Sequence, residues 1–407
     1  ETNRKKSPIP LPMHMMSALM TLQSSKLGLG FLQGELPNSK LALEIPETMK
    51  ARIATEVLGD DPLKFSTAID RAIARRFSFY QEGIKKYQDA DFVNKRNKRP
   101  AAWAKGSASL LSYTKEADDY PLFVIPSLVN RYYILDLLRE NSFLRWLANE
   151  GWGPYVMDWG HPGPAESDFG LEDYIVQYLL PALKEVEKRS GKKPVVIGYC
   201  MGGALATALS VLAQPLVKSL VLIASPWDFH EKEDQRAIQQ GRWLQSLLPW
   251  INTVGHFSGE GLQSLFASLD PTLSLRKFLN FRQLDVDTEQ AKVFISLEDW
   301  LNDGVSLTQK VACECLQEWY GENLTEKGHW VISGEKVTLD KVRVPTLSVV
   351  SDNDRIVPKA SSLALSAGID RSTLIETPLG HIGIMVSRNA QSKVWKPIVD
   401  WMEQFRS

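Results

Sequence analysis

The stretch of sequence that decides the fold runs Val195-Val196-Ile197-Gly198-Tyr199-Cys200-Met201-Gly202-Gly203-Ala204-Leu205-Ala206. It consists of an apolar strand, a turn with a glycine on each side of one nucleophilic residue, and a helix of small residues. The spacing Gly-x-Cys-x-Gly is the nucleophile-elbow pattern, with sulfur in place of the serine hydroxyl. A sharp turn from strand to helix leaves no room for side chains two positions before or after the nucleophile. The stretch therefore predicts a nucleophilic Cys200 at a strand-to-helix turn.

The same turn predicts the groups that stabilise negative charge beside the cysteine. The backbone N–H of Met201, at the N-terminus of the helix, faces the oxyanion that develops when a nucleophile attacks a carbonyl group. The positive end of the helix dipole also favours the thiolate form of Cys200. A second N–H donor is expected from the loop Pro126–Asn130, after the first long parallel strand. We therefore expect an oxyanion hole built from Met201 and either Leu128 or Val129.

A cysteine nucleophile needs a base, and the base needs an acid that orients it. In the α/β-hydrolase fold these residues follow one another in the order nucleophile, acid, histidine. The acid is expected in the loop Asp352–Pro358, where the distance to the closing Ile-Val-Pro favours Asp354 over Asp352. His381, one of only six histidines, follows the last apolar run and is the expected general base. The predicted triad is Cys200, Asp354 and His381.

From about residue 106 onward, short apolar runs alternate with helical segments. The runs are mostly unalternated, which is typical of strands buried on both faces of a parallel sheet. They are Tyr120–Pro126, Pro154–Trp159, Pro194–Tyr199, Ser219–Ala224, Pro345–Ser351 and Ser372–Thr377. This alternation predicts the α/β class, and with the triad an α/β-hydrolase fold, with a mostly parallel sheet covered by helices. The acid loop and the histidine loop both follow strand ends, where such sheets place their sites.

Two segments fall outside this alternation. Residues 1–105 show helical periodicity, which predicts an N-terminal helical extension. Residues 230–330 contain no convincing strand and are rich in Trp, Phe and Leu. About a hundred residues are too many for a loop inside a compact domain, so this segment is expected to be an inserted lid, or cap, subdomain. The hydrolase core is then expected in two parts, residues 106–229 and 331–407.

The composition limits the classes of ligand. With 44% hydrophobic and 23% charged residues, the chain has the composition of an ordinary soluble globular protein. Its 47 Lys and Arg against 48 Asp and Glu give a formal net charge of −1, so no overall positive field attracts nucleic acid. No stretch reaches the roughly 18 to 20 apolar residues of a membrane span. Pro8–Leu22 also lacks the cleavage signature of a signal peptide. We expect no nucleic-acid partner and no transmembrane segment.

The three cysteines bear on compartment and metal binding. Three thiols cannot pair completely, which favours a reducing compartment. Cys313 and Cys315 have no partner at metal-ligand spacing, so we interpret them as structural thiols. We expect a cytoplasmic location, no metal and no bound cofactor.

At several motifs the chain resembles the polyhydroxyalkanoate (PHA) synthases. These motifs are Gly198–Gly203, Asn130–Leu137 followed by Glu140–Ser142, Asp158–Gly160, Asp354–Pro358 and Gly380–Ile382. The stretch Asn-x-Tyr-Tyr-Ile-Leu-Asp-Leu is quite specific to that family, and the resemblance covers roughly residues 106 to 400. The chain departs from the family at Arg355, because the synthases usually have histidine after the corresponding aspartate.

The resemblance implies an acyltransferase that polymerises (R)-3-hydroxyacyl-CoA and releases CoA, with Cys200 acylated, His381 as the base and Asp354 as the third member. The CoA thioester is then a substrate rather than a cofactor. The family also implies a growing polyester, a homodimer or a helper subunit, and a place on polymer granules. Two alternatives stay open. One is a synthase-like hydrolase, a thioesterase or esterase with the same triad, and the other is a non-catalytic scaffold that binds a partner.

Overall fold

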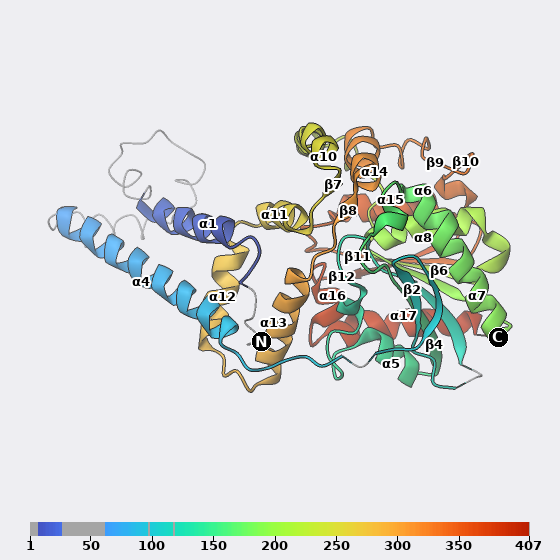
Figure 1. Cartoon of the computed structure of the whole chain (residues 1–407), viewed down its shortest axis with the longest axis horizontal. Coiled ribbons are helices and arrows are strands. Elements are labelled where there is room, and N and C mark those ends of the chain that lie inside the picture. The colour runs from blue at the N-terminus through green and yellow to red at the C-terminus, as the bar shows by residue number, and fades with distance from the viewer. Residues whose placement is uncertain (1–6, 27–61, 97, 117–118, 407) are drawn as a thin grey trace. The chain divides into compact units, whose positions relative to one another are not determined.

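The computed structural model describes residues 7–26, 62–96, 98–116 and 119–406, and the element labels are those of Figure 1. The chain forms two compact units. The first consists of Glu1–Phe92 with Gln263–Asn302, and the second of Val93–Leu262 with Asp303–Ser407. The four-part division expected from the sequence remains a prediction, and the structure groups the middle of the expected lid with the N-terminal helices.

An eight-stranded sheet forms the centre of the second unit, in the order β1-β2-β4-β3-β5-β6-β11-β12 (Figure 1). The strands are β1 (Ala101–Lys105), β2 (Ala108–Ser112), β3 (Tyr120–Ile125), β4 (Trp152–Asp158), β5 (Val195–Tyr199), β6 (Ser219–Ile223), β11 (Thr346–Ser351) and β12 (Ser372–Thr377). Only β1 with β2 and β2 with β4 pair antiparallel; the other neighbours pair parallel. The predicted mostly parallel sheet is confirmed, and so are its six predicted strands.

Helices cover both faces of this sheet. In Figure 1, α8 lies on one side of it and α5 and α17 lie on the other. Helix α8 packs against β5 and β6, whereas α5 packs against β4 and meets Trp395 through Phe143 and Trp146. The bounds are α5 (Phe143–Asn149), α6 (Leu171–Asp173), η5 (Tyr174–Leu179), α7 (Leu180–Ser190), α8 (Met201–Leu212), α15 (Lys359–Gly368), α16 (Gly383–Val386), η9 (Gln391–Trp395) and α17 (Lys396–Met402). Short η turns are η3 (Tyr132–Leu135), η4 (Pro164–Glu166), η6 (Gln214–Leu216), η8 (Leu339–Lys341) and η10 (Glu403–Phe405).

The segment between β6 and β11 contains helices and only very short strands. Its helices are α9 (Gln235–Gln245), α10 (Leu248–Val254), α11 (Gly259–Leu269), α12 (Leu273–Gln283), α13 (Glu289–Asn302), α14 (Gln309–Cys313) and η7 (Glu314–Gly321). Two small antiparallel pairs join it, formed by β7 (His256–Phe257) with β8 (Leu307–Thr308) and by β9 (Val331–Ile332) with β10 (Glu335–Lys336). The strands of these two pairs are only two residues long, which agrees with the lack of a convincing strand in the sequence of residues 230–330; the inserted lid remains a prediction.

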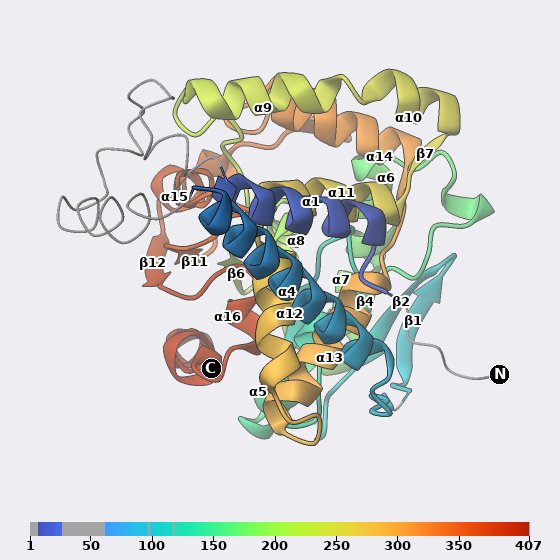
Figure 2. The same ribbon diagram turned by 90° about the vertical axis from the view of Figure 1, so that its left-hand side faces the viewer.

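The first unit is helical and has its own core. It contains α1 (Leu11–Gln23), η1 (Ser24–Lys26) and α4 (Pro62–Gln88), and α4 packs along α12 (Figure 2). Tyr80, Tyr87 and Phe278 are fully buried between these helices. The Tyr80 hydroxyl forms a 2.9 Å hydrogen bond with Ser274 Oγ. None of the helices in the described ranges has the length and apolarity needed to cross a membrane.

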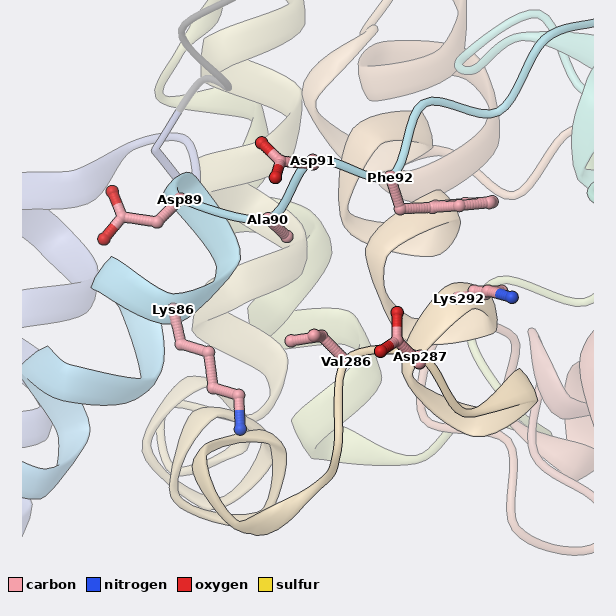
Figure 3. A pocket seen from close by; sticks show the side chains of 8 residues that line it. All are labelled: Lys86, Asp89, Ala90, Asp91, Phe92, Val286, Asp287 and Lys292. Carbon is pink, nitrogen blue, oxygen red and sulfur yellow. The ribbon is translucent and has the colours of Figure 1, made fainter.

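A pocket of about 550 Å³ lies in this first unit, where the end of α4 meets the segment between α12 and α13 (Figure 3). Its lining mixes charges of both signs and is made of Lys86, Asp89, Ala90, Asp91, Phe92, Val286, Asp287 and Lys292. Lys86 Nζ donates hydrogen bonds to the carbonyl oxygens of Arg282, at 3.1 Å, and Leu284. This lysine therefore caps the end of α12, and the pocket contains none of the predicted site residues.

Candidate active site

Cys200 occupies a strained turn between β5 and α8. Its backbone has φ 55° and ψ −132°, a conformation that L-residues rarely adopt. A Cβ atom on Gly202 would lie 2.1 Å from the Ile125 carbonyl oxygen, and one on Gly198 would lie 2.5 Å from Gly203 Cα. Both glycines are therefore required for the helix to approach the sheet so closely. The predicted strand, turn and helix are all present, and the turn presents the thiol at the carboxyl end of β5.

His381 and Asp354 meet at the carboxyl ends of β12 and β11. His381 Nδ1 lies 2.6 Å from Asp354 Oδ2, and the Asp354 side chain is only 1% exposed. The other carboxylate oxygen of Asp354, Oδ1, accepts hydrogen bonds from the backbone N–H groups of Ile356 and Val357, both at 2.8 Å. Two backbone donors thus fix the carboxylate, and the carboxylate in turn orients the imidazole ring.

The alternative acid, Asp352, has a different environment. Its side chain is exposed and forms a 2.7 Å ion pair with Lys359. Its backbone N–H donates to the Thr377 carbonyl at 2.9 Å, which ties the acid loop to the end of β12. The structure therefore brings Asp354, and not Asp352, to His381.

Cys200 and His381 interact electrostatically. Burial alone would lower the pKa of His381, but the Cys200 thiolate charge and hydrogen bonds with Asp354 and Cys200 raise it to about 10. A raised pKa means that the imidazolium form is favoured while the thiol is ionised. The arrangement therefore favours an imidazolium beside negative charge, the form that a general base takes once it has accepted a proton.

The expected oxyanion donors lie around the start of α8. Met201 is the first residue of α8, so its N–H belongs to the helix terminus. The Val129 N–H donates to Ser127 Oγ at 3.2 Å, which engages it locally. Leu128 is buried, and its N–H forms no hydrogen bond with any part of the chain that the structure describes. Both loop donors remain predictions, and of the two the Leu128 N–H is the one without a partner in the described part of the chain.

The chain is similar in sequence to known proteins. Residues 120–387 match the sequence profile of the family described as "alpha/beta hydrolase fold". The chain is 31% identical to the "Poly(3-hydroxyalkanoate) polymerase subunit PhaC" of Allochromatium vinosum, over 71% of this chain and 82% of that protein. It is 30% identical to the protein of the same name from Thiocystis violacea, over 70% of this chain and 81% of the relative. The chain belongs to the poly(3-hydroxyalkanoate) polymerase family.

Not every member of the polymerase family is matched along its full length. The chain is 28% identical to the polymerase subunit of Haloarcula marismortui and covers 62% of that protein. The matches to the family profile and to the polymerase subunits confirm the resemblance to PHA synthases and the α/β-hydrolase fold expected from the sequence.

Two tyrosines of this polymerase-family site were not predicted from the sequence. Tyr199 lies beside the histidine, and its ring centroid is 5.3 Å from that of His381. Burial raises the pKa of Tyr320, a residue of η7, and the charges of Cys200 and Cys315 act in the same direction. His230 Nε2 lies 3.2 Å from the Tyr320 carbonyl oxygen, which ties η7 to the loop after β6. Tyr199 adjoins Cys200 in the sequence, whereas no local pattern marks Tyr320.

The other two thiols are not members of the predicted triad. Cys315 is buried, and burial raises the pKa of its thiol. Cys313 is half-buried, and its Sγ lies 3.3 Å from Asn252 Oδ1. Both environments fit the interpretation of structural thiols.

Proposed function

We propose that the chain is an acyltransferase that polymerises (R)-3-hydroxyacyl-CoA with release of CoA, through Cys200, His381 and Asp354. The observation that carries the proposal is the buried His381–Asp354 pair. The charge of Cys200, on the nucleophile elbow, raises the pKa of His381 in this pair. The printed names of its relatives, poly(3-hydroxyalkanoate) polymerase subunits, support the substrate class.

In the first half-reaction His381 removes the Cys200 proton, and the sulfur attacks the thioester carbonyl carbon. The oxyanion that forms is stabilised by the backbone N–H groups of Met201 and Leu128, each such donor being worth about 10²-fold in rate. The carbon–sulfur bond to CoA then breaks, and His381 returns the proton to the departing thiol. A thioester is exchanged for a thioester, so the step is nearly balanced in free energy.

In the second half-reaction His381 removes the proton of a hydroxyl group, and that oxygen attacks the acyl carbon on Cys200. The carbon–sulfur bond to Cys200 then breaks, and His381 returns the proton to the sulfur. If the hydroxyl belongs to another hydroxyacyl unit, the new bond is an ester and the chain grows. If it belongs to water, the product is a free acid. Exclusion of water from the site therefore decides between polymerisation and hydrolysis.

The proposal extends to the surroundings of the enzyme. The proposed ligands are the CoA thioester and the growing polyester, with no cofactor, and the proposed location is the polymer granule in the cytoplasm. The word "subunit" in the relatives' names supports an assembly of this chain with a second copy or a helper chain.

The proposal is tested by incubating the full chain with (R)-3-hydroxybutyryl-CoA and longer acyl homologues. Free CoA is followed with a thiol reagent and insoluble polyester by gas chromatography after methanolysis. We expect both products to appear together. Cys200→Ala should lose activity by about 10⁴-fold or more. Cys313→Ala, which removes a half-buried thiol outside the site, should keep wild-type turnover.

The outcomes separate the candidate functions. Release of CoA with free hydroxy acid and no polymer identifies a hydrolase. If no homologue yields CoA, both enzymatic functions fail and a binding role is supported. If Cys200→Ala stays active, the nucleophile has been misassigned.

A further inference from the structure

Tyr199 connects the strand of the nucleophile with the loop of the histidine. It is the last residue of β5, directly before Cys200, and is only 3% exposed. Its hydroxyl donates a 3.1 Å hydrogen bond to the backbone carbonyl oxygen of His381. Its ring and the imidazole ring are inclined by 31°, with the centroids 5.3 Å apart. The same residue therefore contacts both the main chain and the side chain of His381.

The hydroxyl of Tyr199 is suited to a permanent donor role. Burial raises its pKa well above the ordinary value, and the nearby Cys200 and Asp354 act in the same direction. The phenol therefore stays protonated, and can donate, across the neutral pH range. A buried carbonyl that loses its donor is destabilised, so this hydrogen bond constrains the loop that carries His381.

The ring of Tyr199 adds a second contribution. An aromatic face within about 6 Å attracts a cation. The imidazolium form of His381 is such a cation, and it is the form that accompanies the thiolate. The ring therefore favours the charged pair over the neutral thiol and imidazole.

We propose that Tyr199 is a positioning residue that holds His381 in place for proton exchange with Cys200. The proposal rests on the proposed function, because it takes Cys200 and His381 as the reacting pair. It extends that function by assigning a role to a residue whose phenol lies outside the triad and the oxyanion hole.

The test is the pH profile of Cys200 alkylation by iodoacetamide in the full chain, read by mass spectrometry of the peptide that contains Cys200. Tyr199→Phe loses only the hydroxyl, and Tyr199→Leu loses the hydroxyl and the ring. We expect alkylation at pH 7 to slow by about three- to tenfold in Tyr199→Phe, the range of one neutral hydrogen bond. In Tyr199→Leu it should slow further, with the half-maximal rate at a higher pH than in the wild type. At high pH, where any thiol is ionised, the rates should match the wild type.

Tyr120→Phe is the matched control. Tyr120 is also buried, and its hydroxyl donates to a backbone carbonyl, that of Lys193, at 3.2 Å. It lies at the start of β3, the opposite end of the sheet from Cys200. Its removal should leave the alkylation profile unchanged. With a CoA thioester as substrate, Tyr199→Phe should lower kcat by about three- to tenfold and leave KM unchanged.

A wild-type alkylation profile in Tyr199→Phe and Tyr199→Leu would overturn the proposal. So would equal slowing of Tyr199→Phe at all pH values, because that indicates altered access rather than altered ionisation. If Tyr199→Leu fails to fold, Tyr199→Phe decides alone. The alkylation experiment uses no CoA thioester, so a failed polymerase assay and a failed positioning role are distinguishable.

Discussion

At the scale of single residues, the site depends on which carboxylate orients His381. Asp354→Asn keeps the size of the side chain but removes the charge and supplies an amide where the imidazole needs an acceptor. In a serine protease triad the same change lowers kcat by about 10⁴-fold because the wrong imidazole tautomer is favoured. We expect a loss of about 10³- to 10⁴-fold in CoA release here, measured as kcat at saturating thioester.

The neighbouring carboxylate provides the control for this substitution. Asp352→Asn removes an exposed charge that pairs with Lys359, and such surface pairs are worth about 1 kcal/mol or less. Activity should stay within about threefold of the wild type on that basis. Equal losses in the two variants would show that the acid has been misassigned.

How far these residues could be identified from the sequence depends on how local their signals are. The glycines around Cys200 reflect steric contacts of one turn, so the elbow could be predicted from twelve consecutive letters. Asp354 and His381 could be placed because parallel strands deliver their loops to one edge of the sheet. The hydrogen bond between Tyr199 and His381 could not be predicted in this way. It joins residues 182 positions apart, and it depends on the distance between the ends of two strands, which the sequence does not give.

At the scale of elements, the close approach of α8 to β3 limits which residues the elbow can contain. In Gly202→Ala the added methyl carbon would lie only 2.1 Å from the Ile125 carbonyl oxygen. The Pro126 carbonyl oxygen would lie only 2.7 Å away as well, so little room is left for relief. Overpacking of this kind costs typically about 1–3 kcal/mol, and here we expect about 3 kcal/mol or more. The prediction is a lower urea midpoint, measured by circular dichroism, together with slower Cys200 alkylation.

Gly163→Ala is the comparison for this element. Its Cβ would meet only the Glu166 carboxylate, at 3.6 Å, which is ordinary contact distance. Its extended backbone, with φ −111°, suits alanine. A midpoint close to that of the wild type is expected. If both variants unfold at the same urea concentration, the close approach of α8 to the sheet is not what requires glycine at the elbow.

Elements were predictable from the sequence where burial imposes a clear pattern. Five of the six predicted strands are buried along nearly their whole length and appear as mostly hydrophobic runs, whereas β12 lies at the edge of the sheet and is largely exposed. The edge hairpin β1–β2 was missed because β1, Ala101–Lys105, is mostly exposed and too short to show an alternating pattern. Residues 101–105 were therefore assigned to the helical extension, although they form a strand.

At the scale of the whole molecule, segments far apart in the sequence form common cores. In the first unit, Tyr80 and Ser274 are hydrogen-bonded although 194 residues separate them. The periodicity of α4 and that of α12 do not indicate that these two helices pack against each other. The expected N-terminal extension and the middle of the expected lid therefore appeared in the sequence as separate segments, and only the structure shows that they share a core.

This shared core predicts that α4 and the α12–α13 segment lose structure together. Phe278 is fully buried, and its ring lies 6.1 Å from the rings of Tyr80 and Tyr87 and 5.5 Å from that of Phe294. Phe278→Ala should destabilise this unit by about 3–5 kcal/mol, the cost of removing a buried phenyl ring. Hydrogen exchange followed by mass spectrometry should then show faster exchange in peptides from α4 and from α13, although the substitution lies in α12. Leu273→Ala, at an exposed position of the same helix, should leave both segments protected. Faster exchange in α12 and α13 with unchanged protection of α4 would mean that α4 is stabilised by other contacts.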